Sequence, residues 1–227
     1  MATVRDFFQF VQSDVPKAPA AIMSAAILGA MREFCTKTNV WIRVSDWTTL
    51  LAGQAKYGFT PPAGADVCGI LRVAYRSDPT LPALDVKPIT YDWLQQNRPG
   101  WREETGLAPQ LYWADQPAIV TLIPYPASTM ADQPLSLQAE VTLRPAFTDP
   151  TQDQGAATVP DFLQTYWGEY IGAGAKVRLM TQPKQPWTGD PGYFLKKFED
   201  GIARCKTQVN KSSTRTSTRV QIPRVGV

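Results

Sequence analysis

The sequence predicts an α+β fold in which helices at both ends of the chain flank a β-rich middle. Near both ends, apolar residues recur at three- and four-residue steps, which is the period of an amphipathic helix. Between residues 40 and 143, short runs of β-branched and aromatic residues replace that pattern. We therefore expect a helical bundle from 1–39 and 156–210, an inserted antiparallel β-rich domain over 40–155, and an extended C-terminal arm over 211–227.

The N-terminal segment 1–39 predicts two helices. Residues 6–11 show a short amphipathic pattern that ends before Pro16. A longer helix is expected from Pro19-Ala20 to Asn39. Its apolar positions follow the helical period: Ile22, Met23, Ala26, Ile27, Ala30, Met31 and Phe34.

The middle of the chain predicts short strands with one or two helical turns among them, over 91–96. The turn residues 114–117 indicate a hairpin, and the alternation of apolar and polar residues from Leu135 to Leu143 is typical of a half-buried strand. Together the strands are expected to form a sheet or a small barrel. They are predicted over 40–44, 47–51, 67–75, 84–89, 110–113, 118–123 and 135–143.

The stretch from Pro160 to Val209 predicts a helical hairpin, with a turn at 181–187 and a second helix from about Asp190-Pro191. Interior glycines each cost a helix about 1 kcal/mol relative to alanine, so a cluster of them indicates close approach by another helix or by a neighbouring subunit. We assign inter-subunit helix packing to Gly168, Gly172, Gly174 and Ala175. A phosphate-binding loop is a poorer interpretation, because such glycines lie between a strand and a helix.

The C-terminal segment 211–227 differs in charge from the rest of the chain. Of the 23 Lys and Arg residues, four lie in 211–227 with no acid, which leaves 19 against 20 acids elsewhere. In an extended strand, β-branched and polar residues of this segment would occupy opposite faces. We predict an arm that binds a partner protein, with a disordered tail or nonspecific nucleic-acid contact as the alternatives. Its predicted contact residues are Arg215, Thr216, Thr218, Arg219, Val220, Ile222 and Arg224.

Composition weakens the case for an enzyme. The chain has no histidine, which excludes Ser-His-Asp and Cys-His catalysis and His-ligated zinc. Its three cysteines are too few for a disulfide framework or a metal cage, and buried thiols are expected. No apolar run is long enough to span a membrane, and the N-terminus lacks the pattern of a signal peptide. We predict no catalytic residue, no metal and no cofactor.

Two other groups of residues are candidate sites. Glu103 and Glu104 are adjacent acids that could serve a hydrolase, but a solvated surface is the commoner role for such a pair. Several tryptophans of the middle region could stack on sugars or bases, although packing in a core or against another subunit is the commoner role. These tryptophans are Trp41, Trp47, Trp93, Trp101 and Trp113.

Motifs spread over residues 5–210 resemble the head-to-tail adaptor proteins of short-tailed bacteriophages, of the tail tubular protein A type. The closest match lies in the C-terminal half, and one departure there is Gly192, a poor residue for a helix's first turns. The matching segments are 30–35 with Trp41, 51–57, Trp101, Gly106 with 109–110, 122–126, 159–163, 171–175, 183–187 and 198–203.

The resemblance implies a structural protein of the virion, located at the head–tail interface and assembled in the host cytoplasm. Such adaptors form a twelve-membered ring beneath the portal protein and continue the DNA channel to the tail nozzle. Their C-terminal arms commonly dock on the portal, and double-stranded DNA passes through the ring without sequence-specific contact. The alternatives are a tail-completion or stopper protein of the same region, and a carboxylate-dependent cell-wall hydrolase.

Overall fold

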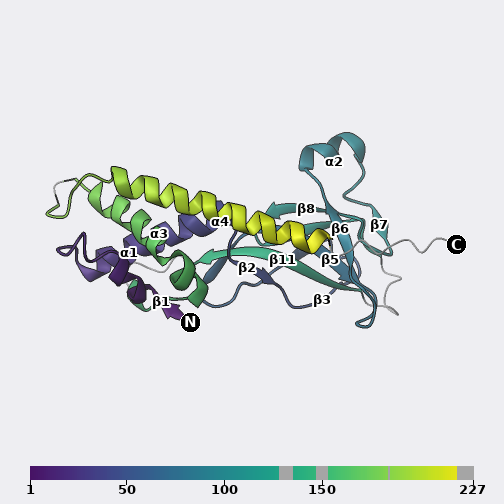
Figure 1. The fold of residues 1–227 in the computed structure, drawn as a ribbon. Helices are drawn as coiled ribbons and strands as arrows, with labels where there is room; N and C mark the ends of the chain where they lie inside the picture. Colours follow the sequence, from purple (N-terminus) through teal and green to yellow (C-terminus); the bar gives the residue numbers. More distant parts are fainter. Residues whose placement is uncertain (128–134, 147–152, 184, 219–227) are drawn as a thin grey trace. The chain divides into compact units, whose positions relative to one another are not determined.

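The computed structural model describes residues 1–127, 135–146, 153–183 and 185–218, with the backbone alone described for 212–218. The chain is mixed α and β, and it divides into two compact units (Figure 1). Unit 1 comprises Met1–Val40 and Arg144–Val227, and unit 2 comprises Trp41–Leu143. Two segments far apart in the sequence therefore form one unit.

Unit 1 is mainly helical. The paired strands β1 and β12 join its N-terminal residues to the segment that precedes α3. Helices α1, α3 and α4 pack on one another, and η1 lies against α1 and α3. The elements of this unit are β1 (Ala2–Thr3), η1 (Val4–Phe10), α1 (Ala20–Thr38), η3 (Gln154–Ala156), β12 (Thr158–Val159), α3 (Asp161–Met180) and α4 (Gly192–Thr218).

The long helices of unit 1 agree closely with the periodicity of the sequence. Helix α1 ends where the sequence predicts it, because Asn39 takes the left-handed conformation (φ 53°) that closes a helix. Helix α4 begins at Gly192, just after the expected start, and the Asp190 side chain accepts a hydrogen bond from the Gly192 amide at 2.9 Å. The N-terminal helix is confirmed as a helix, but it is a 3₁₀ helix that starts at Val4.

Unit 2 is built on a curved sheet with strand order β2-β11-β5-β6-β8-β9-β4, in which β3 also pairs with β11. The predicted hairpin is confirmed, since β8 and β9 pair antiparallel. The strands of the unit are β2 (Ile42–Val44), β3 (Thr48–Thr49), β4 (Lys56–Gly58), β5 (Ala65–Arg76), β6 (Leu84–Pro88), β7 (Thr105–Gly106), β8 (Leu111–Gln116), β9 (Ile119–Ile123), β10 (Tyr125–Pro126) and β11 (Ser136–Pro145), of which β11 ends just beyond the unit.

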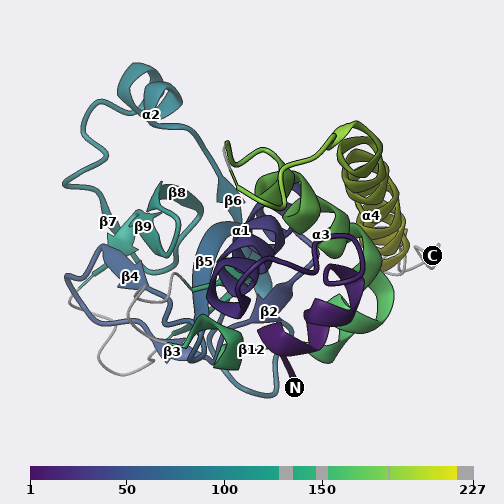
Figure 2. The same ribbon diagram turned by 90° about the vertical axis from the view of Figure 1, so that its left-hand side faces the viewer.

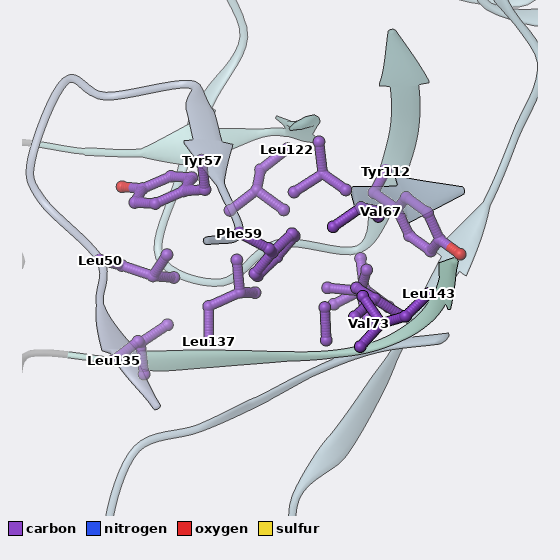
Figure 3. Close-up of a cluster of buried hydrophobic side chains, with 14 of the residues drawn as sticks. Leu50, Tyr57, Phe59, Val67, Val73, Tyr112, Leu122, Leu135, Leu137 and Leu143 are labelled. Carbon is purple, nitrogen blue, oxygen red and sulfur yellow. The ribbon is translucent and has the colours of Figure 1, made fainter. Parts of the chain in front are cut away.

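The segment from β3 to β4 closes this sheet toward a barrel. Its first part pairs with β11 through Thr48 and Thr49, and its last part pairs with β9 through Lys56–Gly58. Tyr57 and Phe59 from this segment therefore meet Leu137 from β11 in one core, and Figure 3 shows their side chains pointing toward one another. Strand β4 was missed in the sequence because so short a strand cannot show an alternating pattern.

Between β6 and β8 the chain leaves the sheet for a long excursion that carries the short helix α2 (Tyr91–Asn97), which stands apart from the strands in both views (Figures 1 and 2). Because β6 and β8 pair in parallel, a connection of this kind is required to return the chain to the same edge. Leu94 and Trp101 pack with Ile123 in a small core of their own.

The glycines of α3 are packed within the chain, which corrects their assignment to inter-subunit contacts. A Cβ atom at Gly168 would lie 2.5 Å from the ring of Phe10, and one at Gly172 would lie 2.7 Å from the Phe10 Cβ. A Cβ atom at Gly174 would lie 2.7 Å from the ring of Phe198. Ala175 is fully buried in the same helix. The surface that small residues open on α3 is therefore already occupied by η1 and α4.

The contact between α3 and α4 is reciprocal. Phe198 of α4 lies against Gly174, and Tyr170 of α3 lies against Gly201, where an added Cβ would come within 2.5 Å of the Tyr170 side chain. Each helix thus supplies one ring and one glycine that receives the other helix's ring. Phe198 also contacts Phe34 of α1, with ring centroids 6.3 Å apart.

Lys176 joins three elements of unit 1. Its ammonium pairs with the carboxylate of Asp14, and it lies 4.6 Å from the ring centroid of Phe194 on α4. The Lys176 side chain is only 11% exposed, so the Asp14 carboxylate is the counter-ion that compensates its charge in this half-enclosed position. The hydrogen bond from Lys176 holds the pKa of Asp14 below its usual value.

We predict that Gly172→Ala destabilises the protein by about 1–3 kcal/mol, because the added methyl group would displace the Cβ and backbone of Phe10, which cannot rotate away. The matched control is Gly29→Ala in α1, where the nearest atoms belong to the end of the Arg178 side chain. That change should be neutral or stabilise by up to about 1 kcal/mol. Urea unfolding of both variants checks this, and equal effects would contradict the packing role.

We also predict that Asp14→Asn lowers stability by about 1–2 kcal/mol at pH 7, because Lys176 loses its counter-ion. Since the pKa of Asp14 is lowered in the folded protein, the carboxylate stabilises the fold above the unfolded value of 3.8, and this is lost as the pH falls below it. Melting temperatures of the variant and the wild type should differ at neutral pH and converge in acid below that value. Asp46→Asn, on an exposed loop residue before β3, is the control and should leave the melting temperature unchanged at neutral pH.

Candidate functional site

The predicted arm starts as helix, not as an extended strand. Helix α4 continues to Thr218, so Arg215, Thr216 and Thr218 have helical backbone. The other predicted contact residues, Arg219, Val220, Ile222 and Arg224, lie outside the described residues. Because residues 214–218 have helical backbone, the alternation of β-branched and polar residues there does not produce the two opposite faces of a strand.

Helix continuation explains this correction. Ser and Thr are weak helix formers, which favoured an extended segment when the tail was considered alone. A helix that is already formed, however, adds each further residue without the cost of nucleation. Phe198, Ile202 and Cys205 anchor α4 by burial against the other helices, and Val209 is half-buried. The segment after Asn210 extends a helix that exists for other reasons.

A long surface groove on unit 1 was not visible in the sequence. It consists of two adjoining hollows of about 630 and 610 Å³ that share Ala25, Gln154 and Arg178. We name it the basic groove. Its floor follows one face of α1 through the small residues Ala21, Ala25 and Gly29, and its sides include Arg32, Glu33, Lys37, Arg144, Asp153 and Arg178.

The basic groove carries more positive than negative side chains: Arg32, Lys37, Arg144 and Arg178 against Glu33 and Asp153. Both carboxylates already have cationic partners. Glu33 binds Lys37 at 2.6 Å and Arg178 at 2.7 Å, and Asp153 binds Arg5. Burial raises the pKa of Glu33, but the hydrogen bonds from Lys37 and Arg178 outweigh it and the pKa lies below its usual value. Lys37 and Arg178 therefore share one carboxylate, and Arg32 donates a hydrogen bond to the backbone carbonyl of Pro145.

The acids considered for a hydrolase do not form a catalytic pair. Glu104 lies 2.9 Å from Arg98 in an ion pair, and its backbone carbonyl accepts a hydrogen bond from the Tyr125 amide. Glu103 is exposed on the turn beside it. An acid–base mechanism needs a second carboxylate or a nucleophile across a cleft, and the two large hollows among the described residues are lined by neither Glu103 nor Glu104.

The tryptophans have mixed roles. Trp101 is buried beside α2, with its ring centroid 6.0 Å from that of Trp113, and Arg102 lies 4.5 Å above it. Trp47 directly precedes β3, and the guanidinium carbon of Arg76 lies 3.9 Å from its ring centroid. Trp93 is 42% exposed and borders a hollow of about 300 Å³ with Lys87 and Thr90. Trp41 lies against the core of unit 2. The four tryptophans other than Trp93 thus contribute to packing.

Chemistry-bearing clusters are few in the part of the chain that the structure describes. No group of three or more acidic or cysteine side chains that could hold a metal ion occurs among the described residues. None of the described helices has both the length and the apolar content needed to cross a bilayer. The three cysteines are thiols: Cys35 and Cys205 are buried as expected, Cys68 is half-buried, and burial raises the pKa of Cys205 to about 11.

No model of a known protein family matches the chain, and the search of curated proteins finds no match either.

Proposed function

We propose that this chain is a structural virion protein, a head-to-tail adaptor of a short-tailed bacteriophage that forms a ring under the portal protein and continues the DNA channel to the tail nozzle. The finer architecture is part of this proposal: a helical bundle from both ends of the chain, with an inserted β-rich domain and a C-terminal segment that reaches a partner. The protein would have no catalytic activity and no cofactor.

The observation that carries the proposal is the position, in the fold, of the motifs that resemble those of adaptors. The segment 171–175 supplies Gly172 and Gly174, and the segment 198–203 supplies Phe198 and Gly201. These residues form the reciprocal contact of α3 with α4 and receive Phe10 from η1. The resemblance therefore rests on residues that determine the packing of unit 1.

The C-terminal segment supports contact with a partner. Helix α4 continues past Val209, its last half-buried position in the described side chains, and ends at Thr218. From Lys211 onward the chain carries four basic residues and no acid. We assign portal binding to this segment, as a helix that leads into the C-terminal residues rather than as a strand. The remaining partners are the tail nozzle protein, other copies of the chain itself in a twelve-membered ring as the resemblance implies, and double-stranded DNA bound without sequence specificity.

The proposal places the protein in the virion at the head–tail interface, after assembly in the host cytoplasm. A tail-completion or stopper protein of the same region is the alternative, and it would occupy a different position along the tail axis. Cryo-electron microscopy of particles that carry the tagged protein distinguishes the two by the distance of the ring from the portal.

We predict that deletion of residues 211–227 leaves a folded protein, since Phe198, Ile202 and Cys205, which bury α4 against the other helices, all precede it, but lowers its affinity for portal-bearing capsids at least about tenfold. Sedimentation of the protein with purified capsids measures the affinity, and circular dichroism verifies the fold. Deletion of 219–227 alone separates the contribution of the C-terminal end from that of the helix. Wild-type attachment by the longer deletion would contradict the assignment.

A charge-reversal variant tests the same segment without shortening the chain. Arg215→Glu, Arg219→Glu and Arg224→Glu together should weaken attachment, because the acidic segment would repel the surface that the basic one binds. Lys206→Glu changes one exposed charge on the same helix before the segment and should leave attachment unchanged.

A further inference from the structure

A small hollow of about 300 Å³ lies on unit 2, where the excursion that carries α2 leaves the sheet. Lys87 and Leu111, which are neighbours in the parallel register of β6 and β8, line it from the sheet, and Trp93 lines it from α2. We name it the α2 hollow. Its lining residues are Lys87, Pro88, Ile89, Thr90, Trp93 and Leu111.

Trp93 is held beside this hollow by the rest of α2. Leu94, the next residue, is fully buried in a small core with Trp101 and Ile123, which fixes the helix to the sheet. The Trp93 carbonyl accepts a hydrogen bond from the Asn97 side chain at 2.9 Å. The Trp93 indole takes no part in that core and is 42% exposed. A ring that is fixed in this way can receive a ligand without reorganisation of the helix.

Three hydrogen-bond donors of the α2 hollow have no acceptor among the described residues. They are the Lys87 ammonium, the Trp93 indole N–H and the Thr90 hydroxyl, whose oxygen accepts from the Trp93 amide. None of the six lining residues is acidic, and Asp85 on the same strand already pairs with another cation. Asp92 of α2 is exposed and forms no ion pair with Lys87. The ligand must therefore supply acceptors and negative charge.

The lining also selects the kind of ring. Trp93 is the one aromatic lining residue, and Pro88, Ile89 and Leu111 are apolar without a ring system that could stack. The negative face of an indole attracts C–H groups such as those on the face of a pyranose sugar. A volume of about 300 Å³ is at the lower end of the range for small-molecule sites, which suits one sugar ring.

A nucleic-acid base fits this lining less well than a sugar acid does. Every base carries N–H donors on its edge, and a lining that offers only free donors would leave them unpaired. A sugar hydroxyl accepts as well as donates, and a carboxylate only accepts.

We propose that the α2 hollow binds a pyranose sugar that carries a carboxylate, as a free uronic acid or as one unit of an acidic polysaccharide. The sugar ring lies on the Trp93 indole, its carboxylate accepts from the Lys87 ammonium, and a hydroxyl accepts from Thr90. The indole N–H at the edge of the ring is then free for the next unit of a polysaccharide. This inference goes beyond the proposed function and does not depend on it, because all of these residues belong to unit 2.

The first test is a titration of the full-length protein with sugars, followed by saturation-transfer NMR. Galacturonate or glucuronate should bind in the millimolar range, and a trimer of the same sugar should bind more tightly, which distinguishes a polysaccharide from a free sugar as the ligand. Galactose, which has a hydroxymethyl group where galacturonate has its carboxylate, should bind at least about tenfold more weakly. Equal binding of galactose, or no binding of either acid or its trimer up to about 10 mM, would overturn the proposal.

Uridine monophosphate tests the other ligand class, because it combines a base with a phosphate. It should not displace the acidic sugar at equal concentration. Displacement by this nucleotide that requires Trp93 would identify a nucleotide site and reject the sugar.

The second test uses variants. Trp93→Ala should lower the affinity for the acidic sugar at least about tenfold. Lys87→Met should lower the affinity for galacturonate to that for galactose and leave galactose binding unchanged, a result that a loss of structure would not give. Tyr193→Ala and Lys17→Met change exposed residues of unit 1 and are the matched controls, with binding expected at the wild-type level.

Circular dichroism verifies that each variant is folded. Wild-type affinity for the acidic sugar in folded Trp93→Ala, or an unchanged preference over galactose in folded Lys87→Met, would refute the site.

Discussion

The exchange of aromatic rings and glycines between α3 and its neighbours is the contact on which unit 1 depends. Interior glycines weaken a helix by about 1 kcal/mol each, and α3 and α4 carry several. Burial of a ring such as that of Phe198 contributes about 1.5–3 kcal/mol, so the packing that the glycines admit offsets their cost. Helix stability here comes from tertiary contacts rather than from propensity.

This constraint determines how the chain is organised. Phe10 lies in η1, far along the chain from the α3 glycines that it covers, so Met1–Val40 and the part after Arg144 must meet for either to be stable. The strands between them can be accommodated because unit 2 has a separate core. The segment from β3 to β4 pairs with β11 and with β9, and Leu50, Tyr57 and Phe59 are buried in a core made of residues of unit 2 (Figure 3).

Periodicity predicted the long helices, the β8–β9 hairpin and the strand β11, because each is long enough to show its pattern. The cost of glycine in a helix also predicted that the glycines of α3 need a close neighbour. It could not identify that neighbour, since nothing in the sequence near Gly172 points to Phe10. The helical start of the C-terminal segment was missed because its residues were judged apart from the helix that they continue. The basic groove was missed because α1, α3 and the segment around Gln154 form it jointly.

The correction to the glycines changes which surfaces remain for self-association. While η1 and α4 cover the small residues of α3, Ala21 and Ala25 of α1 are exposed, and Gly29 is half-buried beside the Arg178 side chain. In the ring that we propose, contacts between copies would therefore use surfaces other than the glycine face of α3.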